Sequence, residues 1–212
     1  MADPKQKFYE KRGQVLVKNL QSRHFEAYYC GTKEEALKKA LELIPEGVSV
    51  GWGGALSAQQ IGLLDAVNNG PYHAIDRDKT TTPSEREEAQ RKCLLADYFI
   101  TGANALSMDG QMVNIDGNGN RVAALIYGPR NVIVIAGMNK AVATLEDAVV
   151  RARTIAAPMN KQRFALQTPC EITGTCADCK SDGCICNQIV ITRNCKPAGR
   201  IKVILVAEEL GF

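Results

Sequence analysis

The run Val132-Ile133-Val134-Ile135-Ala136 constrains the fold most strongly, because an unbroken apolar stretch of this length suits a strand covered on both faces. Strands of that kind belong to parallel sheets, whose crossover helices lie on both sides. The rest of the chain has the matching pattern, in which short β-rich stretches alternate with amphipathic helical stretches. The sequence therefore predicts an α/β fold, with a mostly parallel sheet and helices on both faces.

The expected elements follow from periodicity and from helix start and stop signals. Strands are expected over residues 25–30, 48–50, 71–75, 98–101, 112–115, 132–136, 188–192 and 201–206. Helices are expected over residues 5–22, 33–44, 57–68, 83–94, 121–127 and 139–156, with Thr144 near the start of the last one or at an internal restart. Thr32 with Glu35, and Thr82 with Glu85, have the spacing of capping boxes. Residues 102–110 are expected to form a loop, and Pro158 to interrupt the last helix.

Length and composition fit one α/β domain over residues 1–212, with a helix and strand in 1–30 and a Cys-rich C-terminal insertion at 168–196. Hydrophobic residues make up 45% and charged residues 23%, which excludes a disordered or collagen-like chain. A net charge of +3 argues against a nucleic-acid partner, and no apolar run is long enough for a membrane span. Residues 1–12 precede no apolar signal-peptide region, so the expected compartment is the cytoplasm.

A glycine-rich turn joins an expected strand to an expected helix at Gly51, Gly53 and Gly54, with Ser57 in the first helical turn. Glycines let the backbone approach a ligand closely, and Ser57 could hydrogen-bond an anion or cap the helix. The spacing matches neither a dinucleotide fingerprint nor a P-loop, so no nucleotide cofactor is predicted. The alternative is a tight turn that binds nothing.

A second candidate region, residues 97–121, is dense in Asn, Asp and Gly beside predicted strand ends. Ligands of α/β sheets usually bind at such ends, so we expect Gly102, Asn104, Asn120 and Arg121 to help bind a polar ligand. Arg121 is the preferred cation because a guanidinium binds carboxylate or phosphate in a fork. The alternative is an exposed hairpin between two sheet strands.

Proton chemistry, if present, would fall to a carboxylate in the same region. Asp109 and Asp116 are the candidate catalytic residues. His73 lies at a strand end, where a structural role is more common for a lone histidine. Lys140 follows the last buried strand and is a candidate either for anion binding or for a solvated position.

Six of the eight cysteines fall between residues 170 and 195. Cys170, Cys176, Cys179, Cys184 and Cys186 contain one C-x2-C and one C-x-C spacing, and no histidine lies nearby. An all-thiolate zinc site or an iron–sulfur cluster is therefore expected, although the spacing does not match a ferredoxin run. A redox-active thiol site and inert thiols are the alternatives.

The chain also resembles the LUD domain family, which includes bacterial lactate-utilisation proteins. The resemblance is carried by TGANAL (101–106), DG (109–110), VNIDG (113–117), GNRVAAL (119–125), GPR (128–130) and VIAGMNK (134–140), and it extends over nearly the whole chain. It implies a fold similar to that of sugar isomerases and CoA transferases, in which a glycine-rich loop binds an anionic group. Asn104 stands where phosphosugar isomerases of this type often have an acidic residue. An amide is not a general base, so the resemblance does not imply that this chain catalyses the isomerase reaction.

The resemblance further implies that Cys170, Cys176, Cys179 and Cys186 are the metal ligands, while Cys184 and Cys195 are additions in this chain. Iron–sulfur is favoured slightly over zinc, because LUD proteins often belong to systems with iron–sulfur partners.

Two functional hypotheses follow from these observations. In the first, loops 51–57 and 102–121 form a pocket for a small anionic metabolite, such as an organic acid or a phosphorylated or CoA-like ligand, in organic-acid or lactate utilisation. In the second, the chain is a non-catalytic accessory subunit of a redox complex, with redox partner subunits and a cysteine-held metal. The sequence leaves open whether the chain is an enzyme and whether it forms homo-oligomers.

Overall fold

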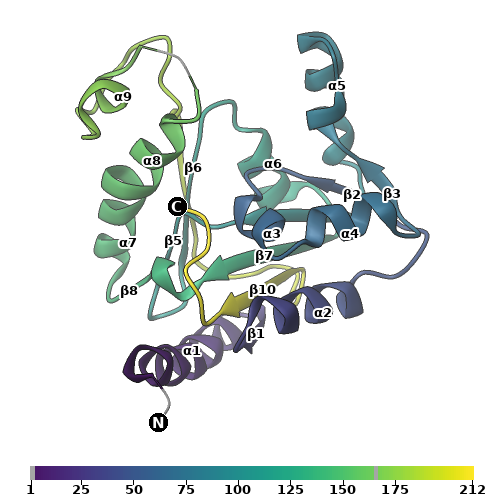
Figure 1. Cartoon of the computed structure of the whole chain (residues 1–212), viewed down its shortest axis with the longest axis vertical. Coiled ribbons are helices and arrows are strands. Elements are labelled where there is room, and N and C mark those ends of the chain that lie inside the picture. The colour runs from purple at the N-terminus through teal and green to yellow at the C-terminus, as the bar shows by residue number, and fades with distance from the viewer. Residues whose placement is uncertain (1–2, 165–166) are drawn as a thin grey trace.

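A parallel sheet forms the centre of the computed structural model, which describes residues 3–164 and 167–212 (Figure 1). Its strand order is β1-β10-β7-β4-β2-β3, and every neighbouring pair is parallel. The strands are β1 (Glu26–Cys30), β2 (Ser49–Trp52), β3 (His73–Ile75), β4 (Tyr98–Gly102), β7 (Asn131–Gly137) and β10 (Ile201–Val206). The predicted parallel sheet is thus confirmed, and β7 lies inside it, as its apolar run required.

Helices cover both faces of this sheet, as predicted. The helices are α1 (Pro4–Ser22), α2 (Lys33–Leu43), α3 (Leu56–Gln60), α4 (Leu63–Asn69), α5 (Pro83–Cys93) and α6 (Asn120–Tyr127). Val132 and Val134 of β7 belong to the core shared with α1, α5 and α6. Ile133 and Ile135 point to the opposite face and pack with α2, α3 and α4. Alternation along one strand therefore divides the core into two layers.

The starts of α2 and α5 follow the predicted capping residues. Thr82 caps α5 with a complete capping box, because its hydroxyl accepts the N–H of Glu85 and the Glu85 carboxylate accepts the N–H of Thr82. Thr32 accepts the N–H of Glu35 at 3.2 Å, but the Glu35 carboxylate accepts from Gly31 rather than from the cap residue. The threonine hydroxyl therefore sets where each helix begins.

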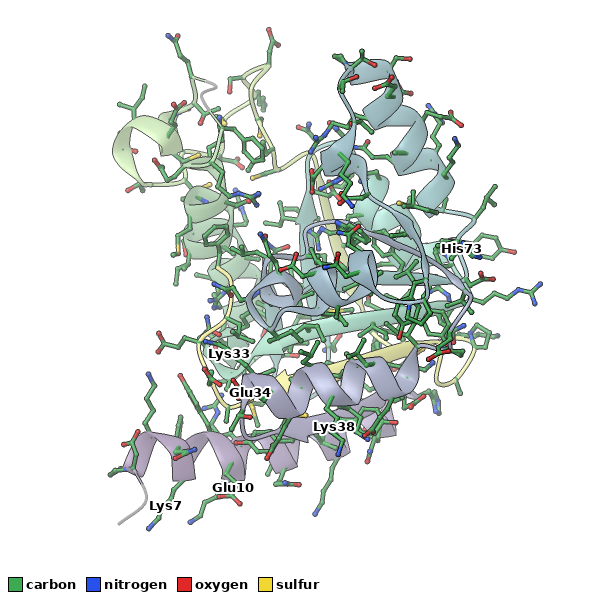
Figure 2. The ribbon with its side chains drawn as sticks, turned by 45° about the vertical axis from the view of Figure 1, so that its right-hand side comes forward. Lys7, Glu10, Lys33, Glu34, Lys38 and His73 are labelled. Carbon is green, nitrogen blue, oxygen red and sulfur yellow. The ribbon has the colours of Figure 1, made fainter. Side chains whose placement is uncertain are left out.

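The outer surfaces of α1 and α2 carry charged side chains. Figure 2 shows Lys7 and Glu10 on α1, and Glu34 and Lys38 on α2, directed away from the sheet, and all four are exposed. Apolar residues on the opposite side of each helix face the core, so both helices have the amphipathic character that the sequence indicated.

A second sheet, which the sequence analysis did not separate, has the order β8-β5-β6-β9. Its strands are β5 (Ala105–Ser107), β6 (Met112–Asp116), β8 (Ala141–Val142) and β9 (Gln188–Thr192). β6 pairs antiparallel with both β5 and β9, so two strands expected in a mostly parallel sheet lie outside it. β5 is only three residues long and ends before a turn, which is why residues 102–110 resembled a loop.

Helices α7 (Leu145–Arg151) and α8 (Ala157–Lys161), joined by a π-helical turn (Ala152–Ala156), pack on the second sheet. The predicted helix 139–156 is therefore shorter at its start, because Met138–Lys140 forms a 3-10 turn and β8 follows it. Thr144 caps α7 with a full capping box, which confirms the expected restart. Pro158 does not interrupt the helical path, because the π-helical turn leaves it in the first turn of α8, where no N–H donor is needed.

The predicted helix 57–68 is divided into α3 and α4 at Gly62. Gly62 has φ of 81°, a left-handed conformation that glycine adopts without steric cost and that ends α3. Further along the chain, α9 (Pro169–Thr173) opens the Cys-rich segment, and β9 attaches that segment to β6. Among the described residues, no helix combines the length and apolar character needed to cross a membrane.

Gly13 tests the packing of α1 on the sheet. A Cβ at this position would lie 2.2 Å from Cδ2 of Tyr29, so the helix approaches β1 closely only because residue 13 has no side chain. Alanine normally stabilises a helix interior by about 1 kcal/mol relative to glycine. We expect Gly13→Ala instead to lower the free energy of unfolding by about 1–3 kcal/mol in urea denaturation, because of overpacking.

Gln14→Ala is the matched control, since Gln14 is exposed on the same helix and should change stability little. A Gly13→Ala variant more stable than the parent chain would contradict the close packing of α1 on Tyr29.

Candidate functional site

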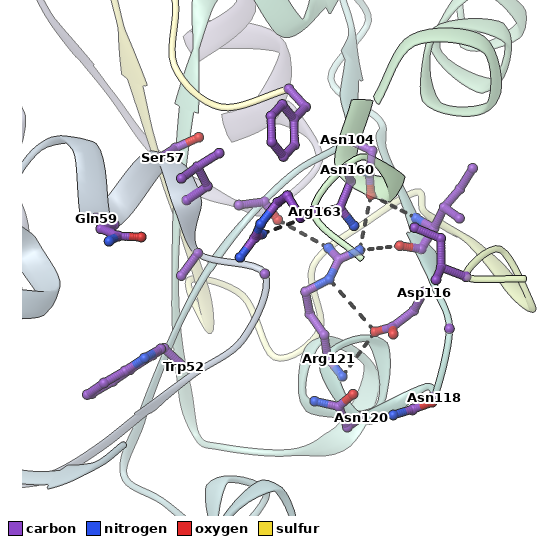
Figure 3. Close-up of a pocket in the computed structure, with 18 of the residues that line it drawn as sticks. Trp52, Ser57, Gln59, Asn104, Asp116, Asn118, Asn120, Arg121, Asn160 and Arg163 are labelled. Atoms are coloured by element: carbon purple, nitrogen blue, oxygen red, sulfur yellow. Dashed lines mark hydrogen bonds and ion pairs between the residues drawn. The ribbon is translucent and has the colours of Figure 1, made fainter. Parts of the chain in front are cut away.

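A pocket of about 400 Å³ opens where the carboxyl ends of β2 and β4 meet the second sheet (Figure 3). Its walls include several residues that the sequence singled out, namely Gly54, Ser57, Gly102, Asn104, Asp116, Asn120 and Arg121. The two predicted loops come together because β2 and β4 are parallel neighbours and end at the same edge of the sheet.

Backbone hydrogen bonds join the glycine-rich loop to the end of β4. Gly53 donates its N–H to the carbonyl of Ile100 at 3.1 Å, and Gly102 donates to the carbonyl of Gly54 at 3.2 Å. The buried hydroxyl of Thr101 donates to the carbonyl of Gly53 at 2.8 Å. These contacts hold the loop against the strand end, so the pocket wall is built mainly from paired backbone.

Arg121 occupies the back of the pocket, and its guanidinium is bound by the protein itself (Figure 3). Nη1 donates to Oδ1 of Asn114 at 2.6 Å and to the carbonyl of Gly102 at 3.4 Å. Nη2 donates to Oδ1 of Asn104 at 3.0 Å and to the carbonyl of Ile115. Burial lowers the pKa of Arg121, and the acceptors around it compensate for the buried charge. Arg121 therefore shapes the pocket, whereas the sequence predicted that its guanidinium would bind the carboxylate or phosphate of a ligand.

Asp116 is similarly engaged by the protein. Its Oδ2 accepts the N–H groups of Arg121 and Val122, both at 3.1 Å, and lies 3.7 Å from Nε of Arg121. Its Oδ1 accepts from Gly119 at 3.3 Å. A carboxylate with these bonds holds the start of α6 and stabilises the buried guanidinium. The bonds also occupy the oxygens that a general base would use.

Lys140 lies on the opposite wall, buried to 4% exposure, with its Nζ 3.1 Å from Oγ of Ser57 and 3.0 Å from the carbonyl of Ala103. Burial, together with the positive charges of Arg151 and Arg121, lowers the pKa of Lys140 from 10.5 to about 7. Ser57 is also buried, at 1% exposure. This amine therefore changes its charge near neutral pH, next to a hydroxyl.

The C-terminal segment covers the pair formed by Ser57 and Lys140. A Cβ at Gly211 would lie 2.8 Å from Oγ of Ser57 and 2.9 Å from Nζ of Lys140, and Gly211 has φ of 62°. The N–H of Gly211 donates to Oε1 of Gln60 at 2.6 Å, and Phe212 lines the pocket. Glycine at this position allows the backbone to lie directly against the two polar side chains.

Three more arginines line the pocket mouth. Arg86 donates to Asp78 at 2.8 Å, whereas Arg77 lies 4.0 Å from the same carboxylate. Among the described residues, Nε of Arg77 is buried without a hydrogen-bond partner. Arg163, which follows α8, contributes the third guanidinium, and Figure 3 shows it beside Asn160. These residues make the wall strongly cationic.

The LUD domain family model matches residues 13–206. The chain belongs to the LUD domain family. No match is found among proteins with curated functions.

Comparison with solved structures finds two similar chains. A DUF162 family protein from Deinococcus radiodurans is 12% identical to this LUD domain, with a TM-score of 0.55 over 93% of this chain and 98% of that one. It shows a shared fold. A D-ribose-5-phosphate isomerase in complex with phospho-erythronic acid is 18% identical, with a TM-score of 0.34 over 53% of this chain and 54% of that one. That score is too low to support an argument.

Several predicted site residues of this LUD domain lie away from the pocket. Asp109 is in the turn after β5, where its carboxylate pairs at 2.7 Å with Arg23, the residue directly after α1, and it does not line the cavity. Gly51 lies within β2 against Cys93 of α5, and Gly53 lies behind the wall. His73 is exposed on the edge strand β3 (Figure 2).

Four residues that line the pocket were not predicted from the sequence, namely Arg77, Arg86, Arg163 and Asn160. Lys140 was predicted either to bind an anion or to be solvated. Arg77 and Arg86 stand in a polar stretch and on an exposed helix, where charges normally indicate solvent contact. Arg163 and Asn160 are distant in sequence from the loops they meet, so no spacing marked them. The position of Lys140 directly after a buried strand was the single usable signal.

The cysteines predicted as metal ligands come together around a second cavity. Cys170, Cys176, Cys179 and Cys186 line it, and Cys184 joins them. All eight cysteines are free thiols, and Cys30, Cys93 and Cys195 are buried elsewhere. Burial, together with the charges of neighbouring thiols, raises the pKa of Cys186 to about 12, which opposes a nucleophilic role at neutral pH. Among the described residues, no three His, Cys, Asp or Glu side chains are placed to hold one metal ion.

Arg121 provides a test of the pocket's construction. Arg121→Ala would leave Asp116 without its ion pair, Oδ1 of the buried Asn114 without its donor, and Oδ1 of Asn104 with the N–H of Ile115 alone. We expect the free energy of unfolding to fall by about 2–4 kcal/mol in urea denaturation, because buried polar groups would lose their partners.

Arg91→Ala is the matched control, since Arg91 forms an exposed pair with Glu87 on α5 and should leave stability nearly unchanged. Equal stability of the Arg121→Ala and parent proteins would show that the network does not hold the fold together.

Proposed function

We propose that the pocket of this LUD domain binds a small organic anion, whose phosphate or carboxylate group contacts Ser57 and Lys140. The buried amine of Lys140 carries the proposal. An ammonium held at 4% exposure, beside a hydroxyl in a pocket wall, gains most from a bound negative charge. Among the described residues, its hydrogen-bond partners are the hydroxyl of Ser57 and the carbonyl of Ala103, neither of which is a carboxylate.

The charge of the lining supports an anionic ligand. Five Lys and Arg side chains line the pocket, against two Asp side chains. Both aspartates are already paired, Asp78 with Arg86 and Asp116 with Arg121. The excess positive charge would attract an anion, and the unpartnered Nε of Arg77 could donate to it.

Amide side chains could recognise the remainder of the ligand. Asn104, Asn118, Asn120 and Asn160 line the pocket. Because Oδ1 of Asn104 accepts bonds from Ile115 and Arg121, its amide NH2 is the group it can offer to a ligand. Hydroxyl or carbonyl oxygens on the ligand would suit these donors, as in a hydroxy acid or a phosphorylated polyol. A role in organic-acid or lactate utilisation is consistent with such ligands.

Lys140 is also the residue that would move a proton if the pocket is catalytic. With a pKa of about 7, its neutral form can accept a proton near neutral pH, and its charged form can donate one. Asp116 is less suited to this role because backbone N–H groups occupy its oxygens. Simple ligand binding without chemistry would use the same contacts.

Sulfate binding tests the proposal, because sulfate stays fully ionised across the working pH range whereas phosphate does not. Trp52 lines the pocket and is the chain's one tryptophan, so its fluorescence can follow the titration. The cationic form of Lys140 exists below its pKa of about 7, so affinity should be highest below pH 7. Above that value, affinity should fall by about tenfold per pH unit, since binding takes up one proton.

Lys140→Met should weaken sulfate binding by about 10–100-fold at pH 6 and remove the pH dependence, because a charge-assisted hydrogen bond is lost. Lys92→Met is the control, because Lys92 is exposed on α5 outside the pocket. This variant should keep both the sulfate affinity and its pH dependence. Unchanged sulfate affinity in Lys140→Met, with intact thermal unfolding, would contradict the proposal.

A further inference from the structure

Five thiols of one segment surround a cavity of about 70 Å³ beside α8 and α9. They are those of Cys170, Cys176, Cys179, Cys184 and Cys186. They come from three separate stretches, namely α9, the irregular segment 176–179, and the residues that lead into β9. Ala157, Pro158, Ile185 and Ile189 complete much of the wall, so sulfur is set among apolar groups. This cavity is separate from the anion pocket and needs its own explanation.

The arrangement does not suit a single metal ion. Structural zinc draws four ligands to within about 2.3 Å of one point. Among the described residues, no three candidate ligand side chains converge in that way. The thiols instead stand around a space several times larger than the roughly 10–15 Å³ that holds one water molecule. An iron–sulfur cluster has the opposite requirement, because its thiolates bind different iron atoms around the outside of a core.

Positive charge in the cavity wall also favours ionised cysteine side chains around a bound cluster. Lys161 lines the cavity with a fully buried side chain, 3.9 Å from Glu171. Arg153 lines it as well, paired with Asp178. Lys161 is buried and Arg153 is partly exposed. Cations beside a group of thiolates reduce the repulsion among them, and a cluster held by thiolates carries net negative charge.

We propose that Cys170, Cys176, Cys179 and Cys186 hold a [4Fe–4S] cluster in this cavity, one thiolate to each iron. The sulfur of Cys184 accepts the backbone N–H of Cys186 at 3.4 Å, which gives Cys184 a part in orienting that ligand. The hydroxyl of Ser181 donates to the sulfur of Cys179 at 3.6 Å.

The two cavities share one wall residue. Ile185 lines both the thiol cavity and the anion pocket. Asn187 donates to the carbonyl of Gly117 at 3.1 Å, which ties this stretch to the turn that begins α6. The cluster would therefore sit next to the anion site, an arrangement that suits either a redox enzyme or an accessory subunit of a redox complex.

The test is metal and sulfide analysis of the full chain, purified without oxygen and then reconstituted with ferrous iron and sulfide. We expect about four iron and four acid-labile sulfide per chain, with broad visible absorption that dithionite bleaches. Stoichiometric zinc without iron, or no bound iron after reconstitution, would overturn the proposal. Neither result depends on sulfate binding in the other pocket, so the two proposals can fail independently.

Single substitutions then test the ligands. Cys176→Ser and Cys186→Ser should lose most of the iron, whereas Cys184→Ser should retain it. Cys30→Ala is the outside control, since Cys30 is buried in the core with α2. Circular dichroism before reconstitution separates a lost ligand from a lost fold. Iron retained in Cys176→Ser but lost in Cys184→Ser would overturn the ligand assignment, and equal iron in all variants would overturn the site.

Discussion

The buried guanidinium of Arg121 connects the two sheets, and the pocket depends on that connection. Its nitrogens reach the carbonyl of Gly102 at the end of β4, the side chain of Asn104 before β5, and Asn114 within β6. Asp116 then joins the same guanidinium to the start of α6. A cation buried this deeply is tolerated only when its donors are satisfied, so these elements are held in one relative arrangement.

That arrangement leaves one side of the pocket with charge that the protein does not neutralise. Arg151 donates to the carbonyls of Asn139 and Asn104, and Arg121, although paired with Asp116, donates its other bonds to carbonyl and amide oxygens. Their field, added to burial, lowers the pKa of Lys140 to about 7. Structure and binding are thereby linked: the interactions that stabilise the pocket also make an anion at Ser57 and Lys140 favourable.

The second sheet has a comparable role for the cysteines. β9 pairs with β6 over five residues, and β6 carries Asn114 and Asp116 of the Arg121 network. The Cys-rich segment enters β9 directly and is packed against α8. The Cys-rich segment has little apolar content of its own, and the pairing of β9 with β6, a strand that lines the pocket, fixes its position. Ile185 lines both cavities.

The sequence by itself determined the parallel sheet, the helices on both faces and the capping threonines, because these depend on hydrophobic period and local hydrogen bonding. It also predicted the meeting of residues 51–57 with 102–121, since parallel strands end at one edge. It could not separate the second sheet, because β5 is three residues long and its partners are distant in the chain. Only the tertiary structure decided that Arg121 is engaged internally, that Asp109 lies outside, and that Lys140 is buried beside Ser57. Burial and charge of a polar side chain depend on neighbours that fold in from elsewhere in the chain, and local sequence does not encode them.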